Sequence, residues 1–269
     1  MITMWSKKGR TYTLNTTRNE FVEADAVVIS HPNSGRTWLN DITDLYRRLE
    51  PSAPEIVYTH DILDPPMDDI LRWQDMIEVA THPIRQLGKL VAYHKPIVII
   101  TRDPRDVMVS YFYQKTVREP WLYQIGTITQ RPLFQGTLDQ FVMDDIYGIT
   151  HLVTFMKLMA HHIKNGAYHL TYEAMHRDIR KEVENVLKHM GHVAFDADKV
   201  EAAILGAQFE TAQILEQEEI GNNAPGNAYK YRVGKVGEGK KQLSRGALKY
   251  INLVLERSLD SVYGEYVNG

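Results

Sequence analysis

Two turns that follow short apolar runs carry the residue types most able to do chemistry. The first run, Ala26–Ser30, has the length of a buried parallel strand and stops at His31 and Pro32. A Ser-Gly turn follows, and apolar residues with helical spacing then run from Thr37 to Leu49. A strand, a small-residue turn and a helix N-terminus direct backbone N–H groups at one point. The segment therefore predicts a loop that binds a phosphate or another oxyanion.

The second turn follows the apolar run Ile97–Thr101 and is basic. Arg102 comes directly after the run, and Pro104 stands where a proline can open a helix. Ser110 lies two turns along that helix. Neither turn has the Gly-Lys-Ser/Thr sequence that loops for nucleoside triphosphates need, so a kinase is a remote alternative.

Together these stretches resemble the cytosolic-type sulfotransferases, which use 3′-phosphoadenosine 5′-phosphosulfate (PAPS). The first motif of that family, Pro-Lys-Ser-Gly-x-Thr-Trp-Leu, matches Pro32–Leu39 at all but one fixed position. The second has the spacing of Arg102 and Ser110, and the third, Arg-x-Gly-x-x-Gly, matches Arg232–Gly237. The resemblance implies an α/β fold in a single sulfotransferase domain over residues 1–269. It would be P-loop NTPase-like, with a central parallel sheet flanked by helices and a phosphosulfate-binding loop.

The resemblance also assigns contacts to the donor. The first motif would bind the 5′-phosphosulfate, the second the 3′-phosphate, and the third would be a flap closing over that phosphate. A solvated surface loop is the alternative for the flap, and Val233 stands where family members have Lys, a contact that Lys235 could supply. The adenine would meet Tyr172, Phe209 and Trp38, although Trp38 could equally be a core aromatic. The predicted donor-binding residues are Ser34, Gly35, Arg36, Thr37, Trp38, Arg102, Ser110, Tyr172, Phe209, Arg232, Val233 and Gly234.

His82 is the predicted catalytic base. Sulfuryl transfer needs a group that titrates near neutrality to deprotonate the acceptor, and this group is most often His. The family's base lies in a Thr-His-Leu-Pro segment, which Thr81-His82-Pro83 resembles without the Leu. Ala80 replaces the Lys that often precedes the Thr. His31, by contrast, is expected to pack against or cap the end of its strand.

Asn33 is the main departure from the family pattern. Family members have a Lys here that stabilises charge on the bridging oxygen, whereas Asn brings a hydrogen bond without a charge. Loss of one such donor costs on the order of 10² to 10³ in turnover, and Arg36 on the same loop could substitute in part. Two hypotheses follow: an active enzyme in which Asn33 and Arg36 assist His82, or a catalytically silent protein that binds PAPS or adenosine 3′,5′-bisphosphate (PAP). The presence of a base favours the first hypothesis.

The composition sets further bounds. A chain of 269 residues, 43% of them hydrophobic, can build one α/β domain with a full core. The absence of Cys excludes disulfides and thiol catalysis. A net charge of −3 disfavours a nucleic-acid binder, and the histidines lack metal-ligand spacing, so neither partner is expected. With no long apolar run and no signal-peptide pattern, we expect a cytoplasmic protein without a membrane span.

The remaining elements follow from the same periodicities. Further strands are expected at Tyr168–Thr171 and Ile56–Tyr58. Helices are expected at Ile146–Lys164, at Ile179–Met190 and from Leu243 to Tyr263. Strands that alternate with helices imply a parallel sheet that binds ligands at the carboxyl ends of its strands, where both basic turns lie.

The acceptor is expected to be a small molecule or a saccharide. Its pocket would be formed by variable loops around Tyr58–Trp73 and Tyr113–Phe134. The family's dimer motif is poorly matched by Lys240–Lys249, so the oligomeric state stays open. The aromatic residues near the second loop suit a phenol or a sugar face, and equally an ordinary core and lid; they are Tyr111, Phe112, Tyr113, Trp121, Tyr123 and Phe134.

Overall fold

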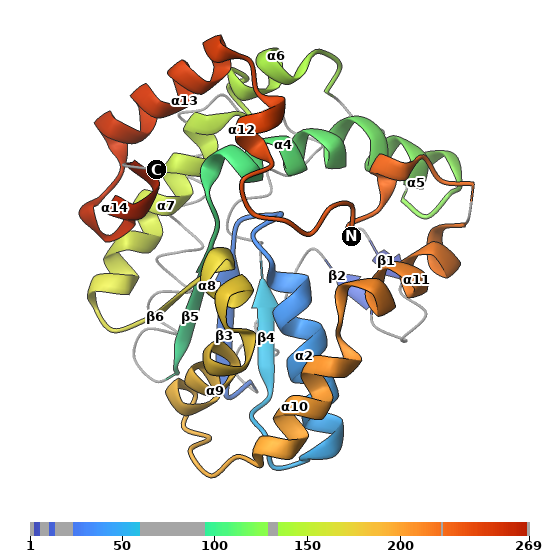
Figure 1. The fold of residues 1–269 in the computed structure, drawn as a ribbon, viewed down its shortest axis with the longest axis vertical. Helices are drawn as coiled ribbons and strands as arrows, with labels where there is room; N and C mark the ends of the chain where they lie inside the picture. The colour runs from blue at the N-terminus through green and yellow to red at the C-terminus, as the bar shows by residue number, and fades with distance from the viewer. Residues whose placement is uncertain are drawn as a thin grey trace.

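A four-stranded parallel sheet, in the order β4-β3-β5-β6, lies at the centre of the protein (Figure 1). The structure is a computed structural model that describes residues 3–5, 11–13, 24–59, 95–128, 134–221 and 223–267. Three strands have the bounds that the sequence predicts and β4 is one residue longer, so the predicted α/β fold with a parallel sheet is confirmed. The strands are β3 (Ala26–Ser30), β4 (Ile56–Thr59), β5 (Ile97–Thr101) and β6 (Tyr168–Thr171). A separate antiparallel pair consists of β1 (Thr3–Trp5) and β2 (Thr11–Thr13).

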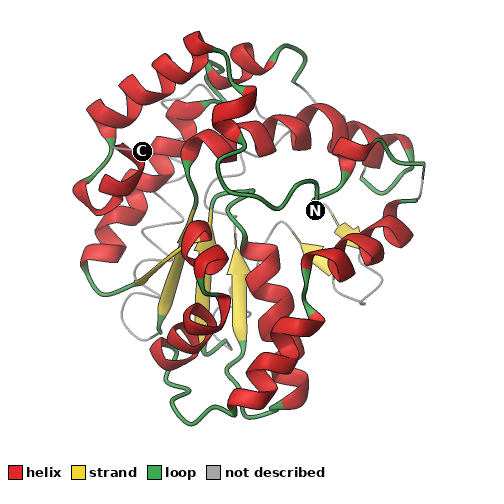
Figure 2. Ribbon diagram, viewed as in Figure 1, coloured by secondary structure: helices red, strands yellow, loops and turns green. Residues whose placement is uncertain are grey.

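Helices cover both faces of the sheet (Figure 2). On one face lie α2 (Arg36–Leu49), α8 (Tyr172–Arg177), α9 (Ile179–His189) and α10 (Ala197–Gly206). On the other lie α4 (Pro104–Tyr113), α6 (Leu138–Val142), α7 (Ile149–Lys164), α13 (Arg245–Ser258) and α14 (Gly264–Val267). The remaining elements are the π-helical turn η1 (Gln114–Arg118), α5 (Glu119–Gln124), α11 (Phe209–Ile220), η2 (Gly226–Ala228), α12 (Gly239–Gln242) and η3 (Ser261–Tyr263). Within the described ranges, no helix is long and apolar enough to span a bilayer.

Each face of the sheet has its own apolar core. Val28 and its alternate neighbours pack with Leu39 of α2, whereas Val27 packs with Val107 of α4 and Phe155 of α7. All five residues of β3 are buried. Burial on both faces explains why β3 and β5 are continuous apolar runs rather than alternating polar and apolar residues.

The carboxyl ends of β3 and β5 lie side by side. The two strands are parallel, and Ser30 of β3 pairs with Ile100 of β5. Along the chain, β4 is added on one side of β3 and β5 on the other, so the order in which strands are added reverses at this point. Open α/β sheets bind ligands outside such a switch point. The loop after β3 and Arg102 after β5 therefore meet where the fold favours a ligand.

Three predicted helices have different ends in the structure. Helix α7 begins at Ile149 rather than Ile146, because the Asp144 carboxylate accepts the N–H groups of Ile146 and Tyr147 and holds them in a turn. Helix α9 ends one residue early, at His189. The C-terminal helix begins at Arg245, where the Ser244 side chain caps it, and it ends at Ser258; η3 and α14 follow as separate elements.

Candidate active site

The loop between β3 and α2 has a backbone shape that few residues adopt. Asn33 and Gly35 have φ angles of 66° and 98°, and Asn33 is the one non-glycine residue with positive φ in the described part of the chain. A Cβ atom at Gly35 would lie 2.6 Å from Cδ2 of Tyr172, so a side chain does not fit there. Arg36 and Thr37 open α2, whose first turn directs N–H groups toward this loop. The loop has the shape that an oxyanion site at a helix N-terminus requires.

Arg102 lies beside this loop and is surrounded by polar groups. Its Nη1 donates to the carbonyl of Asn33 at 3.3 Å and lies 3.5 Å from Oγ of Ser110. Its Nη2 donates to the carbonyl of Lys235 at 3.1 Å, and the guanidinium lies 4.2 Å from the ring centroid of Tyr172. The Nε of Arg102 is buried and has no hydrogen-bond partner among the described residues. A guanidinium held in this way, with a spare donor, suits an anion.

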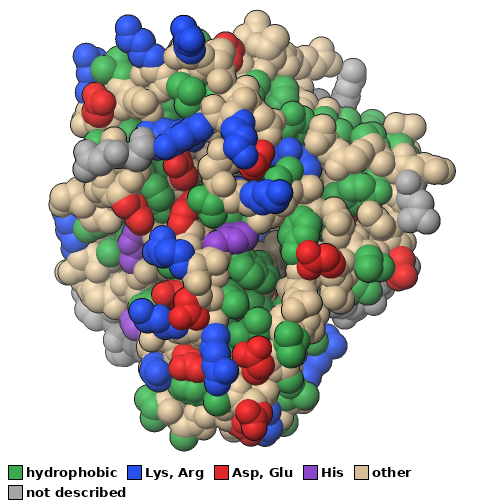
Figure 3. Space-filling view, viewed as in Figure 1, with side chains coloured by type: hydrophobic (Ala, Val, Ile, Leu, Met, Phe, Trp, Pro, Cys, Tyr) green, Lys and Arg blue, Asp and Glu red, His purple; other side chains and the backbone are tan. Residues whose placement is uncertain are grey.

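Residues 229–238, which we call the flap, run from η2 to α12 and pass close to α4 (Figure 1). The ring of Phe209, the first residue of α11, packs so closely on Gly234 that a Cβ atom there would lie 2.4 Å from it. The guanidinium of Arg232 lies 4.4 Å from the ring centroid of Tyr113, with Val233 between Arg232 and Gly234 in the chain. Lys and Arg side chains gather on the face that the flap crosses (Figure 3). The structure thus brings the third motif to Arg102 and to Phe209.

A small aromatic cluster stands next to the loop. The ring of Tyr172 lies 6.2 Å from that of Trp38 and 4.5 Å from that of His176, and the rings of Trp38 and His176 are 5.1 Å apart. Burial raises the pKa of the Tyr172 hydroxyl. Trp38 also packs against the core beneath it, as the core alternative predicts, while its contact with adenine stays a prediction. Sequence reasoning missed His176, although its spacing of four residues from Tyr172 on α8 could have indicated it.

Asn33, at the position of the family lysine, ends a chain of hydrogen bonds. Its Nδ2 donates to Oε1 of Gln114 at 2.8 Å, and Nε2 of Gln114 donates to Oε1 of Glu119 at 3.0 Å. The same Glu119 oxygen pairs with Nζ of Lys115 at 2.9 Å. Gln114 opens the π-helical turn η1, a rare feature that often occurs at functional sites. Gln114 and Lys115 were not among the predicted site residues, because this contact depends on the tertiary fold.

His31 is buried behind the loop. Its Nδ1 contacts the carbonyl of Pro32 at 2.9 Å, and its Nε2 lies 3.5 Å from Nδ1 of His151, which is also buried. Burial and the neighbouring His151 lower the pKa of His31 to about 3. A neutral, buried ring of this kind packs the strand end, as expected from the sequence. The described residues contain no cluster of three or more His, Asp or Glu that could hold a metal.

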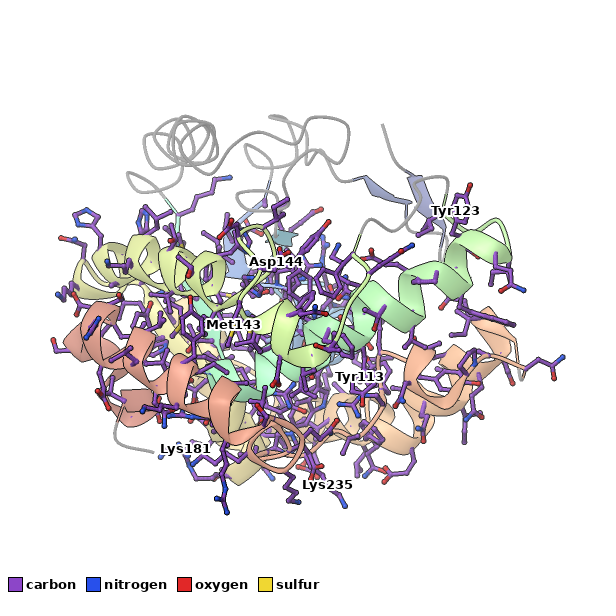
Figure 4. All side chains as sticks on the ribbon, turned by 90° about the horizontal axis from the view of Figure 1, so that it is seen from above. Tyr113, Tyr123, Met143, Asp144, Lys181 and Lys235 are labelled. Atoms are coloured by element: carbon purple, nitrogen blue, oxygen red, sulfur yellow. The ribbon has the colours of Figure 1, made fainter. Side chains whose placement is uncertain are left out.

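The aromatic residues at the end of α4 and in the segment after it belong mainly to the core. Tyr111 is fully buried against Phe141, and Phe112 and Phe134 pack against the same cluster. Trp121 donates its Nε1 hydrogen to the carbonyl of Ile220 at 3.0 Å. Tyr123 is exposed, and Tyr113 points toward the flap (Figure 4). Most of these residues therefore belong to the core, which was one of the two alternatives from the sequence.

Several predicted positions lie outside the described residues. They include His82 with its flanking Thr and Pro, and most of the first acceptor loop, Tyr58–Trp73, beyond Thr59. The described residues therefore cover only the predicted donor side of the site: the loop, Arg102, Ser110, the aromatic cluster and the flap.

Comparison with known proteins identifies the family. Residues 23–262 match the Sulfotransferase domain family. The chain belongs to the sulfotransferase family. Human sulfotransferase 2B1 is 25% identical over 62% of this chain and 46% of its own length, and human sulfotransferase 4A1 is 24% identical over 66% and 63%. The chain thus spans about half to two thirds of the length of these two relatives.

Solved structures share the fold of this chain. Mouse sulfotransferase SULT7A1, in complex with PAP, superposes with a TM-score of 0.57 at 15% identity, over 98% of this chain and 97% of its own. Retinol dehydratase, in complex with retinol and PAP, superposes with a TM-score of 0.56 at 18% identity, over 88% and 81%. At these identities the likeness establishes the fold.

Proposed function

We propose that the protein transfers a sulfuryl group from PAPS to a hydroxyl or amine of a small-molecule or saccharide acceptor. One observation carries the proposal: Arg102, with its spare buried donor, lies beside the loop at the N-terminus of α2. We call residues 31–37 the 5′ corner, and Arg102, Ser110 and the flap the 3′ corner. Two anion sites in this arrangement suit a nucleotide with phosphates on both its 3′ and 5′ oxygens. A nucleoside triphosphate has its phosphates in one chain.

The reaction assigns a role to each part. His82 accepts the proton of the acceptor while the acceptor oxygen or nitrogen bonds to sulfur. The bond from sulfur to the bridging oxygen breaks, and PAP leaves with the electron pair. N–H groups of the 5′ corner, with Asn33 and Arg36, stabilise the charge that develops on this oxygen. Arg102 and the flap hold the 3′-phosphate, which takes no part in bond changes and serves to position the donor.

A protein that binds PAPS or PAP without transferring sulfate is the alternative, and a specific observation favours it. Asn33 brings no charge to the position of the family lysine, and its amide is already hydrogen-bonded to Gln114. Both functions require the nucleotide, so binding of PAP should raise the melting temperature in either case. Only an enzyme needs a base.

Transfer of radiolabelled sulfate from PAPS into a panel of phenols, alcohols, amines and sugars tests the proposal. We expect His82→Ala to abolish transfer and to leave the dissociation constant for PAP nearly unchanged, since the base acts on the acceptor. The exposed His161→Ala on α7 is the matched control and should keep full turnover. Turnover of His82→Ala above about a tenth of wild type, a change within 1.4 kcal/mol of barrier, would assign the base to another residue.

A further inference from the structure

The flap is tied to the protein at both ends by carboxylates. At its start, Glu216 of α11 accepts the backbone N–H groups of Lys230 and Tyr231 at 2.8 and 3.1 Å. Glu216 is buried and also pairs with Arg118, at 2.5 Å. This anchor fixes the flap where it leaves η2.

The other anchor, Asp106, contacts the 3′ corner directly. Its carboxylate accepts the N–H of Gly237 at 2.8 Å and that of Gly239 at 2.6 Å. One of its oxygens also lies 3.5 Å from Nη2 of Arg102, the atom that donates to the carbonyl of Lys235 in the flap. A Cβ atom at Gly239 would lie 2.4 Å from the backbone of α4, so the flap end rests on the helix that carries Asp106.

We propose that Asp106 is a positioning residue for the 3′-phosphate, because it holds Arg102 and the end of the flap in one arrangement. This inference rests on the proposed function, since it concerns how the donor nucleotide is bound. Between the two anchors the flap contains two cations, Arg232 and Lys235, and the backbone carbonyl of Lys235 accepts from Arg102. Asp106 thereby sets the distance between the cations of the flap and the guanidinium of Arg102, which follows β5.

Two opposing effects of Asp106 can be separated. Its negative charge near Arg102 repels a phosphate, so charge alone predicts tighter PAP binding when Asp106 is neutralised. Its two short hydrogen bonds fix the flap, and without them the flap must be ordered each time the nucleotide binds. The carboxylate is 1% exposed and both bonds are charge-assisted, which makes the anchoring effect the larger one. In Asp106→Asn, an amide N–H₂ would face one of the two glycine N–H donors, so one bond is lost.

Calorimetry with two nucleotides tests the proposal. We expect Asp106→Asn to weaken PAP binding at least tenfold and to change the affinity for adenosine 5′-monophosphate less than twofold, because the latter lacks the 3′-phosphate. A general loss of packing would lower both affinities together. An unchanged or tighter PAP affinity in the variant would overturn the inference, as would an equal loss for both nucleotides.

The matched control is Asp144→Asn. Asp144 also accepts two backbone N–H groups, those of Ile146 and Tyr147, at 2.9 and 2.8 Å. It lies well apart from Lys235 of the flap (Figure 4). We expect Asp144→Asn to keep wild-type affinity for both nucleotides.

Trypsin cleavage without any nucleotide tests the anchor on its own. The flap and α12 contain the cleavable residues Lys235 and Lys240. We expect cleavage after these residues to be several times faster in Asp106→Asn than in the wild type and in Asp144→Asn. Equal rates in all three would contradict the anchor. Should Asp106→Asn fail to fold, Asp106→Glu, which keeps the charge and displaces it, should show the same selective loss of PAP affinity.

The outcomes distinguish this inference from the function on which it rests. A wild-type protein that binds no PAP contradicts the proposed function, whatever the variants do. A wild type that binds PAP, with a variant of equal affinity and equal cleavage, contradicts only the role of Asp106.

Discussion

The 5′ corner and the 3′ corner are built by opposite means. The 5′ corner comes from one short segment, and its shape depends on the backbone at Asn33 and Gly35 and on the N-terminus of α2. The 3′ corner joins Arg102 to the flap carbonyl of Lys235, 133 residues later in the chain, and depends on charged side chains. Asp106 holds its two parts together.

The difference separates shape from charge. In the 5′ corner the shape is kept, since Gly35 fits against Tyr172, while the expected loop cation is replaced by Asn33. In the 3′ corner the principal cation, Arg102, is kept, and Val233 replaces one lysine. We therefore expect changes in the 5′ corner to act through loop shape and turnover, and changes in the 3′ corner to act through nucleotide affinity.

The largest effect is expected from Gly35→Ala, which changes the shape of the loop in the 5′ corner. The new Cβ would lie 2.6 Å from the Tyr172 ring, and φ would stay at 98°. Overpacking together with left-handed backbone strain should lower the free energy of unfolding by about 2 to 5 kcal/mol. PAP binding should fall below detection in calorimetry. Gly166→Ala has φ of 100° but open space around it, so it should show the backbone part alone and keep PAP binding.

Arg102→Ala removes the principal cation of the 3′ corner. Its guanidinium contacts the loop, Ser110 and the flap, so PAP affinity should fall about 100-fold, with a small effect on melting temperature. Calorimetry with PAP measures the change. Arg177→Ala, at the exposed end of α8, should change the affinity less than twofold. Equal effects of the two variants would remove the assignment of the 3′-phosphate to Arg102.

Local patterns account for what the sequence predicts correctly. The bounds of β3 and β5 follow from apolar runs buried on both faces, and the start of α4 follows from Pro104. The loop of the 5′ corner could be predicted because all its parts are neighbours in the sequence. The pairing of Arg102 with the flap could be expected only through the family resemblance, since nothing local links them.

The parts that could not be predicted are tertiary contacts. Asp106 is one of many acidic residues in the chain, and its role depends on Gly237 and Gly239 approaching α4. The bond from Asn33 to Gln114 likewise depends on η1 lying over the loop. The C-terminal helix was predicted too long because apolar spacing continues past Ser258, where the backbone becomes extended at Leu259.

A smaller effect concerns how the free energy of unfolding depends on pH through His31, behind the 5′ corner. Burial lowers the pKa of His31, behind the 5′ corner, to about 3, so the unfolded chain binds more protons below about pH 6.5 and stability falls as the pH falls. From about pH 7 to about pH 5 this residue should contribute a loss of about 2 kcal/mol. His31→Asn should show a correspondingly shallower pH dependence in urea unfolding.

The pH dependence of unfolding must be compared between the wild type and His31→Asn, because other histidines also lower the stability as the pH falls. Burial also lowers the pKa of His169, to about 4, so the wild-type curve alone does not isolate His31. Identical slopes for wild type and His31→Asn would mean that His31 is not kept neutral by burial.

The smallest expected effect is also the one that decides between enzyme and binding protein. Asn33→Lys should raise turnover about tenfold, because a cation where charge develops stabilises the transition state more than the ground state. The change has a cost, since Lys is less tolerant than Asn of a φ of 66° and the bond to Gln114 is lost. Stability should therefore fall by about 1 to 2 kcal/mol while turnover rises.

Arg36→Ala should then reduce turnover more in the natural protein than in Asn33→Lys, where a second loop cation is present. Additive effects in this cycle would mean that the two side chains do not share the charge. If Asn33→Lys stays inactive with every acceptor, the 5′ corner serves only to bind the nucleotide.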